Sequence, residues 1–476
     1  MAATLRNLVL FACVVTLCGG WANAKRLLVQ APHGDRNDNL KFGQSTCISN
    51  DGLRIIVGAN GYDKYSGAVY VYDMVTAPGD RLSHWRRTKV RANDTERAEE
   101  KSLHELRVVA RGSGFGFSCA LSGDGSRVVV GAPGHGTQRG AVYVFECCSS
   151  AFRGKGWEQI GQLQVDDGRP GDAFGWDVVV NDECTVLATS AKGKRANNGV
   201  LFVYECEKGC KRCVLSETIA PPDHTDSVGD RGIRIRNNFG TSLGMNRKGD
   251  ILVASSIGYN EERGAVYVFH RDGEGGREWK LLQRLESPKA QRLGFFGYGV
   301  AVDESGDTVA VGADGENEYT GAVYVFRREG VGKKYEFVYE VNAEEAKEED
   351  NFGGAVALSA DGKVLAVGAP GVNEGREKDL GVVHLYEEVL GVRGSRWELG
   401  ETVSIAGERG GRESFFGWNV AISANGKRFV GGAPQWLHGA GAVAFGAFEA
   451  SGRRAPDAGS LMHDEPAPMA EGRDEL

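Results

Sequence analysis

The chain has 476 residues, of which 69 are Gly and 12 are Pro, with 41% apolar and 25% charged side chains. Gly does not recur at every third position, which excludes a collagen-like protein, and the plentiful aliphatic and aromatic residues exclude a chain that is disordered throughout. The formal charge of -8 is spread along the length, and without a large basic patch neither nucleic acid nor another polyanion is the expected partner.

Residues 1–24 have the features of a signal peptide. Arg6 precedes an apolar run from Leu8 to Cys18, and Ala22 and Ala24 occupy the small-residue positions of a cleavage site. The run is too short to span a bilayer, and no other stretch approaches the roughly 20 apolar residues that a spanning helix needs. We therefore expect cleavage after Ala24 and a soluble mature protein without a membrane span.

Residues 25–450 are built from an internal repeat. Each copy opens with Phe-Gly and continues with an alternating apolar run, a turn, a Val-rich run, a polar loop, a Gly and a second alternating run. The seven copies begin at Phe42, Phe115, Phe174, Phe239, Phe296, Phe352 and Phe416.

Each repeat is predicted to form four antiparallel strands. Alternation with period two, together with many β-branched and aromatic residues, is typical of strands and not of helices. Asp124-Gly125 and its counterparts favour a tight hairpin between the first two strands. The third strand reads Ala-Val-Tyr-Val, as at 141–144. The fourth starts at an aromatic residue in five copies, namely Trp85, Trp157, Trp279, Tyr335 and Trp397, whereas Cys213 has that place in the third copy.

Seven such sheets predict a single all-β domain, a seven-bladed β-propeller. A four-stranded sheet cannot bury both faces alone, so neighbouring sheets must stack and close into a ring. The last copy lacks a fourth strand, whereas residues 25–30, before the first Phe-Gly, belong to none of the strands assigned so far. We expect this N-terminal segment to supply the outer strand of the last blade, which removes the open edge of the ring.

Phe-Gly followed by Gly-Ala-Pro, as at 115–116 and 131–133, resembles the FG-GAP repeat of integrin α-subunit heads and of many secreted bacterial and protist proteins. The resemblance covers residues 25 to about 450. It implies a propeller that binds ligands on its upper face, which is formed by the loops between strands two and three and between strand four and the next blade. It also implies calcium loops between strands one and two, but turns such as 49–52 and 359–362 have too few carboxylates for six or more oxygen ligands. We expect no cofactor and no metal.

Enzyme motifs are weak. Gly240–Gly244 matches the G-x-S-x-G nucleophile elbow, but in the repeat register Ser242 lies in the first strand of the fourth blade, and no helix follows. Metalloprotease, P-loop and dinucleotide motifs are absent from the sequence. We expect a protein without enzymatic activity, although a propeller active site can be assembled from several blades without a local motif.

Eight cysteines remain after the signal peptide, and an even number in a secretory-pathway protein favours disulfides. Six of them are predicted to lie on the lower rim of blades two and three. Cys210 and Cys213 form a C-x-x-C motif with two cationic residues between them, so a redox pair, a metal site and a simple hairpin disulfide such as Cys206 to Cys213 remain open. The disulfide candidates are Cys47, Cys119, Cys147, Cys148, Cys184, Cys206, Cys210 and Cys213.

Loops predicted on the upper face contain the candidate binding and modification residues. The sequon at Asn93 lies in a long insertion after the first blade, and we expect it to be glycosylated. Exposed aromatic residues with polar groups are enriched in binding hot spots. We expect a peptide or glycan site across blades seven, one and two, with Trp436 and Tyr65 as anchors and Tyr62, His135 and His438 as polar contacts; the alternative is that each ring packs on its own loop.

Residues 451–476 are rich in Pro, Gly, Ala and acidic side chains, a composition that predicts a disordered tail. The chain finishes with Arg473, Asp474, Glu475 and Leu476, which resembles the KDEL signal for retrieval to the endoplasmic reticulum.

These features together predict a monomeric binding or scaffold protein of the endoplasmic reticulum lumen. Its partners would be a lumenal protein or glycan and a KDEL-type retrieval receptor. The alternatives are a secreted or cell-surface adhesion protein of integrin-head type, in which the terminal tetrapeptide has no role, and a lumenal enzyme that acts on glycans or thiols.

Overall fold

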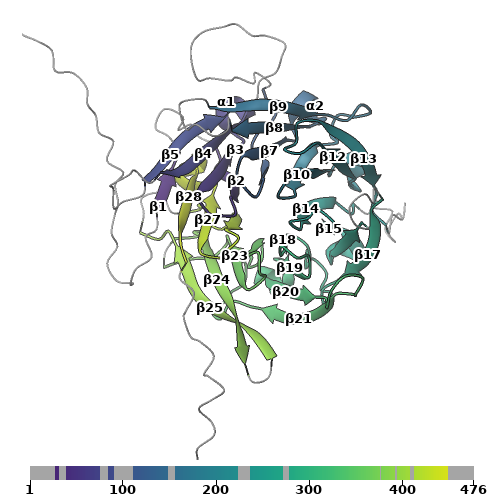
Figure 1. Ribbon diagram of the computed structural model, residues 1–476. Helices are drawn as coiled ribbons and strands as arrows, with labels where there is room; N and C mark the ends of the chain where they lie inside the picture. Colours follow the sequence, from purple (N-terminus) through teal and green to yellow (C-terminus); the bar gives the residue numbers. More distant parts are fainter. Residues whose placement is uncertain are drawn as a thin grey trace, which may run out of the picture.

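The computed structural model describes residues 27–31, 39–75, 84–90, 111–147, 156–222, 236–271, 278–375, 377–391, 394–407 and 412–448. These residues form seven four-stranded antiparallel sheets, which stand as blades around a central axis (Figure 1). The architecture is that of a seven-bladed β-propeller, so the predicted fold is confirmed.

The strands follow the predicted repeat, with the first strand of each blade innermost. Blades one to three contain β2 (Phe42–Ile48), β3 (Arg54–Ala59), β4 (Ala68–Val75), β5 (His84–Val90); β6 (Ser118–Leu121), β7 (Arg127–Ala132), β8 (Ala141–Cys147), β9 (Trp157–Leu163); and β10 (Phe174–Val180), β11 (Val186–Ala191), β12 (Leu201–Cys206), β13 (Cys213–Ile219). Blades four and five contain β14 (Phe239–Met245), β15 (Ile251–Ser256), β16 (Ala265–His270), β17 (Lys280–Leu285); and β18 (Val300–Val302), β19 (Thr308–Ala313), β20 (Ala322–Arg327), β21 (Glu336–Val341). Blades six and seven contain β22 (Ala355–Leu358), β23 (Val364–Ala369), β24 (Val382–Gly391), β25 (Gly394–Ser404); and β26 (Asn419–Ile422), β27 (Arg428–Ala433), β28 (Ala442–Ala447), β1 (Leu27–Gln30).

The N-terminal strand closes the ring as the sequence predicts. β1 pairs antiparallel with β28, with Leu27 opposite Phe445 and Gln30 opposite Ala442. The two ends of the described chain therefore share one blade, visible as the purple strand beside the yellow ones (Figure 1).

The core is divided among the interfaces between neighbouring blades. Among the described residues it forms seven apolar clusters, each filled by the facing sides of two adjacent sheets. The Phe of every Phe-Gly lies in such a cluster with at most 1% of its surface exposed. In most blades this Phe makes an edge-on contact with an aromatic ring of the third strand. In blade two the ring centres of Phe115 and Tyr143 lie 5.5 Å apart.

A glycine before the third strand lets adjacent blades approach closely. Gly140 forms a parallel bridge with Phe174 of the next blade. Its φ is +90°, and a Cβ there would lie 2.0 Å from the carbonyl oxygen of Phe174. Only glycine satisfies both conditions, which explains why each polar loop ends in Gly.

The lower edge of the ring is joined by backbone hydrogen bonds. The second residue of each turn between the first two strands donates its N–H to the corresponding carbonyl oxygen of the next blade. The series runs Asn50 to Gly123, Asp182, Arg247, Glu304, Ala360 and Ala424, and Ala424 donates back to Asn50 at 3.1 Å. This closed circle links blade seven to blade one independently of β1.

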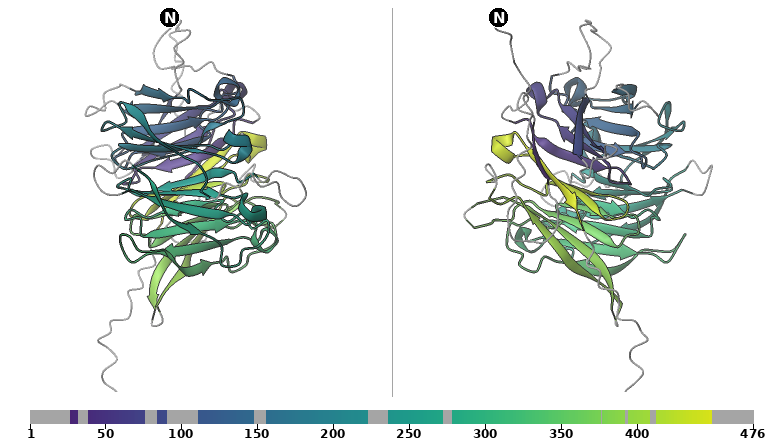
Figure 2. Two further views of the ribbon diagram at one scale, coloured as in Figure 1. Left: turned by 90° about the vertical axis from the view of Figure 1, so that its right-hand side faces the viewer. Right: turned by 60° about the vertical axis from the view of Figure 1, so that its left-hand side comes forward.

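The opposite edge, called the upper face below, consists of the loops between second and third strands and the segments directly before and after each Phe-Gly. Its described residues include six short helices, α1 (Tyr62–Tyr65), α2 (His135–Gln138), α3 (Lys194–Asn197), α4 (Tyr259–Glu262), α5 (Glu316–Tyr319) and α6 (Trp436–Gly439). Their middle residues have left-handed φ values, such as 61° at Thr137 and 58° at His438, so each is a tight turn. In side view these turns project from one edge of the ring (Figure 2). Among the described residues, no helix has the length and apolar character needed to cross a membrane.

Candidate functional site

The first residue of each upper turn packs back onto the third strand of its own blade. His135 Nδ1 lies 3.2 Å from Tyr143 Oη, and its Nε2 lies 3.1 Å from Gln164 Nε2. The buried carboxyl of Glu316 accepts hydrogen bonds from the hydroxyls of Ser287 and Tyr324; burial raises the pKa of this carboxyl, and the two hydrogen bonds oppose the shift. These side chains support the turn.

Trp436 follows the same rule, and the expectation that it is an exposed anchor is wrong. Its exposed fraction is 0%, and it belongs to the cluster between blades six and seven. The reason lies in the third strand of the last blade, where Ala444 occupies the position of the Tyr in Ala-Val-Tyr-Val. Trp436 and Ala444 lie in the same cluster, whereas blades one, two, four and five have a buried Tyr at the position of Ala444. Ala444 was the signal in the sequence that predicts this burial.

The other expected contact residues are divided between packing and exposure. Tyr62 is partly buried against the cluster between blades seven and one. Tyr65 is 44% exposed, with Lys41 Nζ 5.9 Å from its ring centre. His438 is exposed, and His135 is partly buried. The structure thus leaves Tyr65 and His438 on the surface of two adjacent blades.

A cleft of about 400 Å³ lies beside His135. It is lined by His135, Arg139, Gln164, Val165 and Asp166, together with three glycines. Both ring nitrogens of His135 are already close to polar neighbours, so the walls of this cleft are mainly polar and internally bonded.

The residue after Phe-Gly is a further upper-face position that the sequence prediction missed. It is aromatic in four blades, namely Phe117, Trp176, Tyr298 and Trp418. The rings of Trp176 and Phe117 of the neighbouring blade lie 4.7 Å apart in a tilted arrangement, and Lys192 Nζ lies 4.2 Å from the centre of the Trp176 ring. Burial lowers the pKa of Lys192 to about 8.

Tyr298 and Trp418 are 36% and 41% exposed. Tyr319, at the end of α5, is 38% exposed and is equivalent to Tyr65 at the end of α1. Recurrence of an aromatic residue directly after Phe-Gly was a signal available in the sequence. The upper face therefore has exposed aromatic rings on blades one, five and seven.

Asp314 lies next to Tyr298 in blade five. Its side chain is buried, and its Oδ1 has no hydrogen-bond partner among the described residues. Burial raises the pKa of this carboxyl to about 7. Burial also raises the pKa of Tyr298 to about 12, with a further contribution from the negative charge of Asp314.

We expect Asp314 to make folding stability depend on pH. Its carboxyl titrates near 3.8 when unfolded and near 7 when folded, so between these values only the folded state holds the proton. The free energy of unfolding therefore falls as the pH rises from about 4 to about 7. Asp314→Asn should flatten this slope and stabilise the protein at pH 8 by at most about 4 kcal/mol. Denaturant unfolding at pH 4.5, 6 and 8 measures the effect, and identical slopes in both proteins would contradict it.

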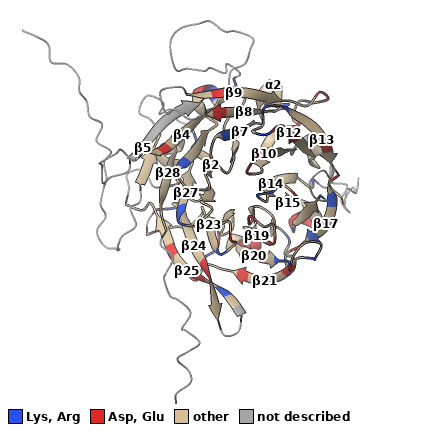
Figure 3. Ribbon diagram, viewed as in Figure 1, with Lys and Arg blue, Asp and Glu red and all other residues tan. Residues whose placement is uncertain are grey.

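Charged residues are interspersed around the ring (Figure 3). At the lower edge, Arg247 forms ion pairs with Asp182 and Glu304 of the two flanking blades. These ion pairs accompany the circle of backbone hydrogen bonds. They are a structural feature of the blade contacts.

Three disulfides connect six of the eight candidate cysteines. Cys47 is bonded to Cys119, which joins the first strands of blades one and two. Cys184 is bonded to Cys210, and Cys206 to Cys213. Cys147 ends β8, whereas Cys148 lies outside the described residues. The C-x-x-C cysteines, Cys210 and Cys213, are thus bonded to other partners and not to each other.

Metal-type ligands converge at one place in the described part of the chain. Cys206, Cys210 and Cys213 have sulfur atoms within 4.8 Å of one another. All three take part in disulfides, which removes the thiolates that a zinc ion would require.

Ser242 lies in β14, as the repeat register predicts, and its N–H donates to Ser255 Oγ at 2.9 Å. The surroundings are those of a strand in a propeller blade. The signal peptide, the sequon at Asn93 and the terminal residues 473–476 lie outside the described residues.

Comparison with known proteins supports the repeat assignment. Residues 109–145, which include most of blade two, match the family model of the FG-GAP repeat. No curated protein sequence is similar enough to match the chain. Among solved structures, a chain of hydrazine synthase from Kuenenia stuttgartiensis has 15% identity and a TM-score of 0.48, with 85% of this chain and 95% of that chain covered. The chain is a seven-bladed β-propeller whose second blade matches the FG-GAP repeat.

Proposed function

We propose that the protein is a binding or scaffold protein that holds a protein or glycan partner on the upper face of the propeller. The observation that supports this proposal is the group of exposed aromatic rings on a rigid ring of blades, namely Tyr65, Tyr298, Tyr319 and Trp418. Large aromatic side chains with a polar atom contribute strongly to binding when a partner covers them. Loops on a rigid scaffold are also where binding specificity is usually built.

The proposed site differs from the one expected from the sequence. Trp436 is not part of the proposed site, because it is buried. Trp418 takes its place as the anchor on blade seven. Tyr65 and His438 remain as contacts on blades one and seven. The site extends toward blade five through Tyr298 and Tyr319.

The test is replacement of Tyr65 and Trp418 by Ala, followed by affinity capture of the partner. We expect binding to fall about 1,000-fold, because two hot-spot rings that each contribute about 2 kcal/mol together contribute about 4 kcal/mol. Leu215→Ala with Val338→Ala is the matched control, since these side chains are similarly exposed but lie on the outer strands β13 and β21. Full partner binding by a folded Tyr65/Trp418 double variant would contradict the proposed site.

We further propose that the protein acts in the endoplasmic reticulum lumen and has no enzymatic activity on its upper face. The N-terminal 24 residues and the terminal Arg-Asp-Glu-Leu support the location. The capture experiment includes a variant without residues 473–476. Under this proposal that variant is released into the medium and loses its lumenal partner, whereas the adhesion alternative predicts that its location and partner are unchanged.

A further inference from the structure

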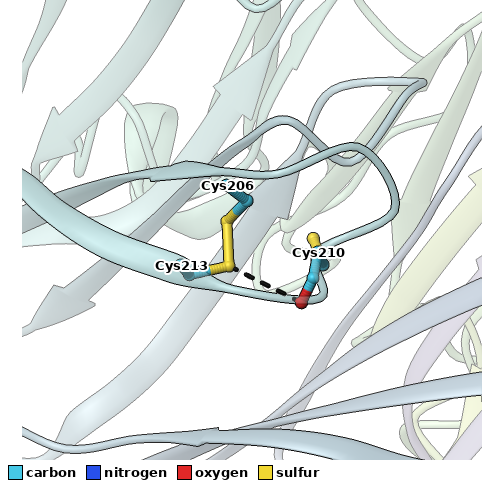
Figure 4. Close-up of side chains that lie close together, drawn as sticks. All are labelled: Cys206, Cys210 and Cys213. Carbon is cyan, nitrogen blue, oxygen red and sulfur yellow. Dashed lines mark hydrogen bonds between the residues drawn. A yellow bond between two sulfur atoms is a disulfide. The ribbon is translucent and has the colours of Figure 1, made fainter.

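Four cysteines form two adjacent disulfides at the hairpin between β12 and β13. Cys206 and Cys213 face each other across this hairpin and are bonded, while Cys210 in its turn is bonded to Cys184 in the turn between β10 and β11. The Sγ atoms of Cys206, Cys210 and Cys213 all lie within 4.8 Å of one another. Figure 4 shows Cys210 beside the Cys206–Cys213 bond.

The two disulfides differ in access. Cys184 and Cys210 have exposed fractions of 0% and 2%, whereas Cys206 and Cys213 are partly exposed. An external thiol can therefore reach the outer bond, Cys206–Cys213, more readily than the inner bond, Cys184–Cys210.

The surroundings of the cluster favour thiolate chemistry. Lys211 and Arg212 stand between Cys210 and Cys213 and are exposed, and nearby cations stabilise a thiolate. Cys184 and Cys210 have φ values of 53° and 56°, a left-handed conformation that costs roughly 1–2 kcal/mol per residue outside Gly. The left-handed φ of Cys184 belongs to the hairpin turn itself, because glycines with positive φ hold the same place in the other six blades.

We propose that this cluster is a thiol–disulfide exchange site that accepts electrons from a protein dithiol and passes them from the outer disulfide to the inner one. This site is separate from the upper face and extends beyond the proposed binding function. The disulfide within the C-x-x-C motif, Cys210–Cys213, is the product of the exchange and is absent at its start.

The exchange has two balanced steps. A thiolate of the dithiol attacks Cys206 Sγ and expels Cys213 as a thiolate; the second thiol of the dithiol then closes its own disulfide and releases Cys206. The dithiol is oxidised by two electrons, and its two protons end on Cys206 and Cys213. In the second step the Cys213 thiolate attacks Cys210 Sγ, the Cys210–Cys213 bond forms, and Cys184 leaves as a thiolate that takes up the proton given up by Cys213.

The test uses the intact protein with limiting dithiothreitol as the dithiol, followed by trapping of thiols with N-ethylmaleimide. Trypsin places all four cysteines on separate peptides, because Lys192, Lys208, Lys211 and Arg212 lie between them. We expect a new peptide that links Cys210 to Cys213, with Cys184 and Cys206 alkylated. The Cys47–Cys119 bond, which has no third described cysteine close to it, is the internal control: its two cysteines should stay bonded to each other or be alkylated together, without a new pairing. Alkylation of Cys206 and Cys213 alone, with Cys184 still bonded to Cys210, would overturn the proposal.

A variant separates exchange from direct reduction. In Cys206→Ser with Cys213→Ser the outer disulfide is missing, so alkylation of Cys184 at the same dithiothreitol dose should fall at least tenfold. An unchanged rate would show that the inner bond is reduced directly and would overturn the proposal. If the variant does not fold, the peptide map of the wild-type protein decides alone.

Discussion

In a chain that begins at Lys25, deletion of residues 25–30 should lower the free energy of unfolding by about 5 kcal/mol. β1 contributes a four-residue ladder with β28, and its three aliphatic side chains pack on both neighbouring clusters. Each partly buried aliphatic side chain contributes roughly 1 kcal/mol, and each hydrogen bond that is lost adds about 0.5–1.5 kcal/mol. For a domain of this size the loss corresponds to a decrease of about 5 °C in Tm.

The truncated protein should nevertheless retain the ring at low temperature. Ala424 still donates to Asn50 at the lower edge, and Phe42 still bridges Gly441 at the upper edge. The measurement is thermal unfolding monitored by circular dichroism, with a chain that begins at Lys25 as the reference. Equal midpoints for the two proteins would contradict the role of β1. Loss of all native structure at 20 °C would instead mean that the inner contacts alone cannot close the ring.

The fold could be predicted from the sequence because its determinants are local and repeated. The repeats share the alternation of apolar residues, Phe-Gly and the Gly before the third strand, and each of these features has one physical explanation. The missing fourth strand of the last copy points to the N-terminal segment as its replacement. The circle of lower-edge hydrogen bonds could not be predicted, because it involves only backbone atoms of residues as different as Gly123, Arg247 and Ala424.

The candidate site was harder to predict because the burial of a side chain depends on which residues of neighbouring strands pack against it. Trp436 looked exposed among small and polar neighbours, but the residue that decides its position is Ala444 on the adjoining strand. The aromatic residues after Phe-Gly were hidden by their place at the start of a strand, where packing is the usual role. Tyr298 and Trp418 are exposed because of how the inner strands lie at the upper face. The sequence alone does not predict that arrangement.

The cysteines show a similar limit. Their spacing and the secretory context predicted disulfides, but eight cysteines allow 105 pairings. Cys184 and Cys210 are brought together because the lower turns of one blade stack on each other; Cys210 N–H donates to the carbonyl oxygen of Cys184 at 2.9 Å. That contact belongs to the tertiary structure. The simple hairpin pairing of Cys206 with Cys213 was the one that strand register could indicate.

Gly140→Ala should be strongly destabilising, whereas Gly136→Ala four residues earlier in the same loop region should be mild. Both glycines have positive φ, at +90° and +57°. A Cβ at Gly140 would lie 2.0 Å from Phe174 O, whereas a Cβ at Gly136 would have no atom within 4 Å. Phe174 cannot move away, because its ring is buried in the cluster between blades two and three and its N–H donates to Arg139 O at 3.0 Å.

The pair of variants therefore separates backbone conformation from contact between blades. Gly136→Ala has only the cost of a left-handed alanine, about 1 kcal/mol, whereas Gly140→Ala adds the displacement of one blade from the next, and its total should reach about 3 kcal/mol or more. Guanidinium unfolding of both variants measures the difference. Equal losses would mean that φ alone explains the glycine and that the bridge to Phe174 contributes nothing. If Gly140→Ala is much more destabilising than Gly136→Ala, the same explanation applies to Gly67, Gly264, Gly321 and Gly441. At each of these a Cβ would lie 2.0 to 2.1 Å from the Phe carbonyl oxygen of the neighbouring blade.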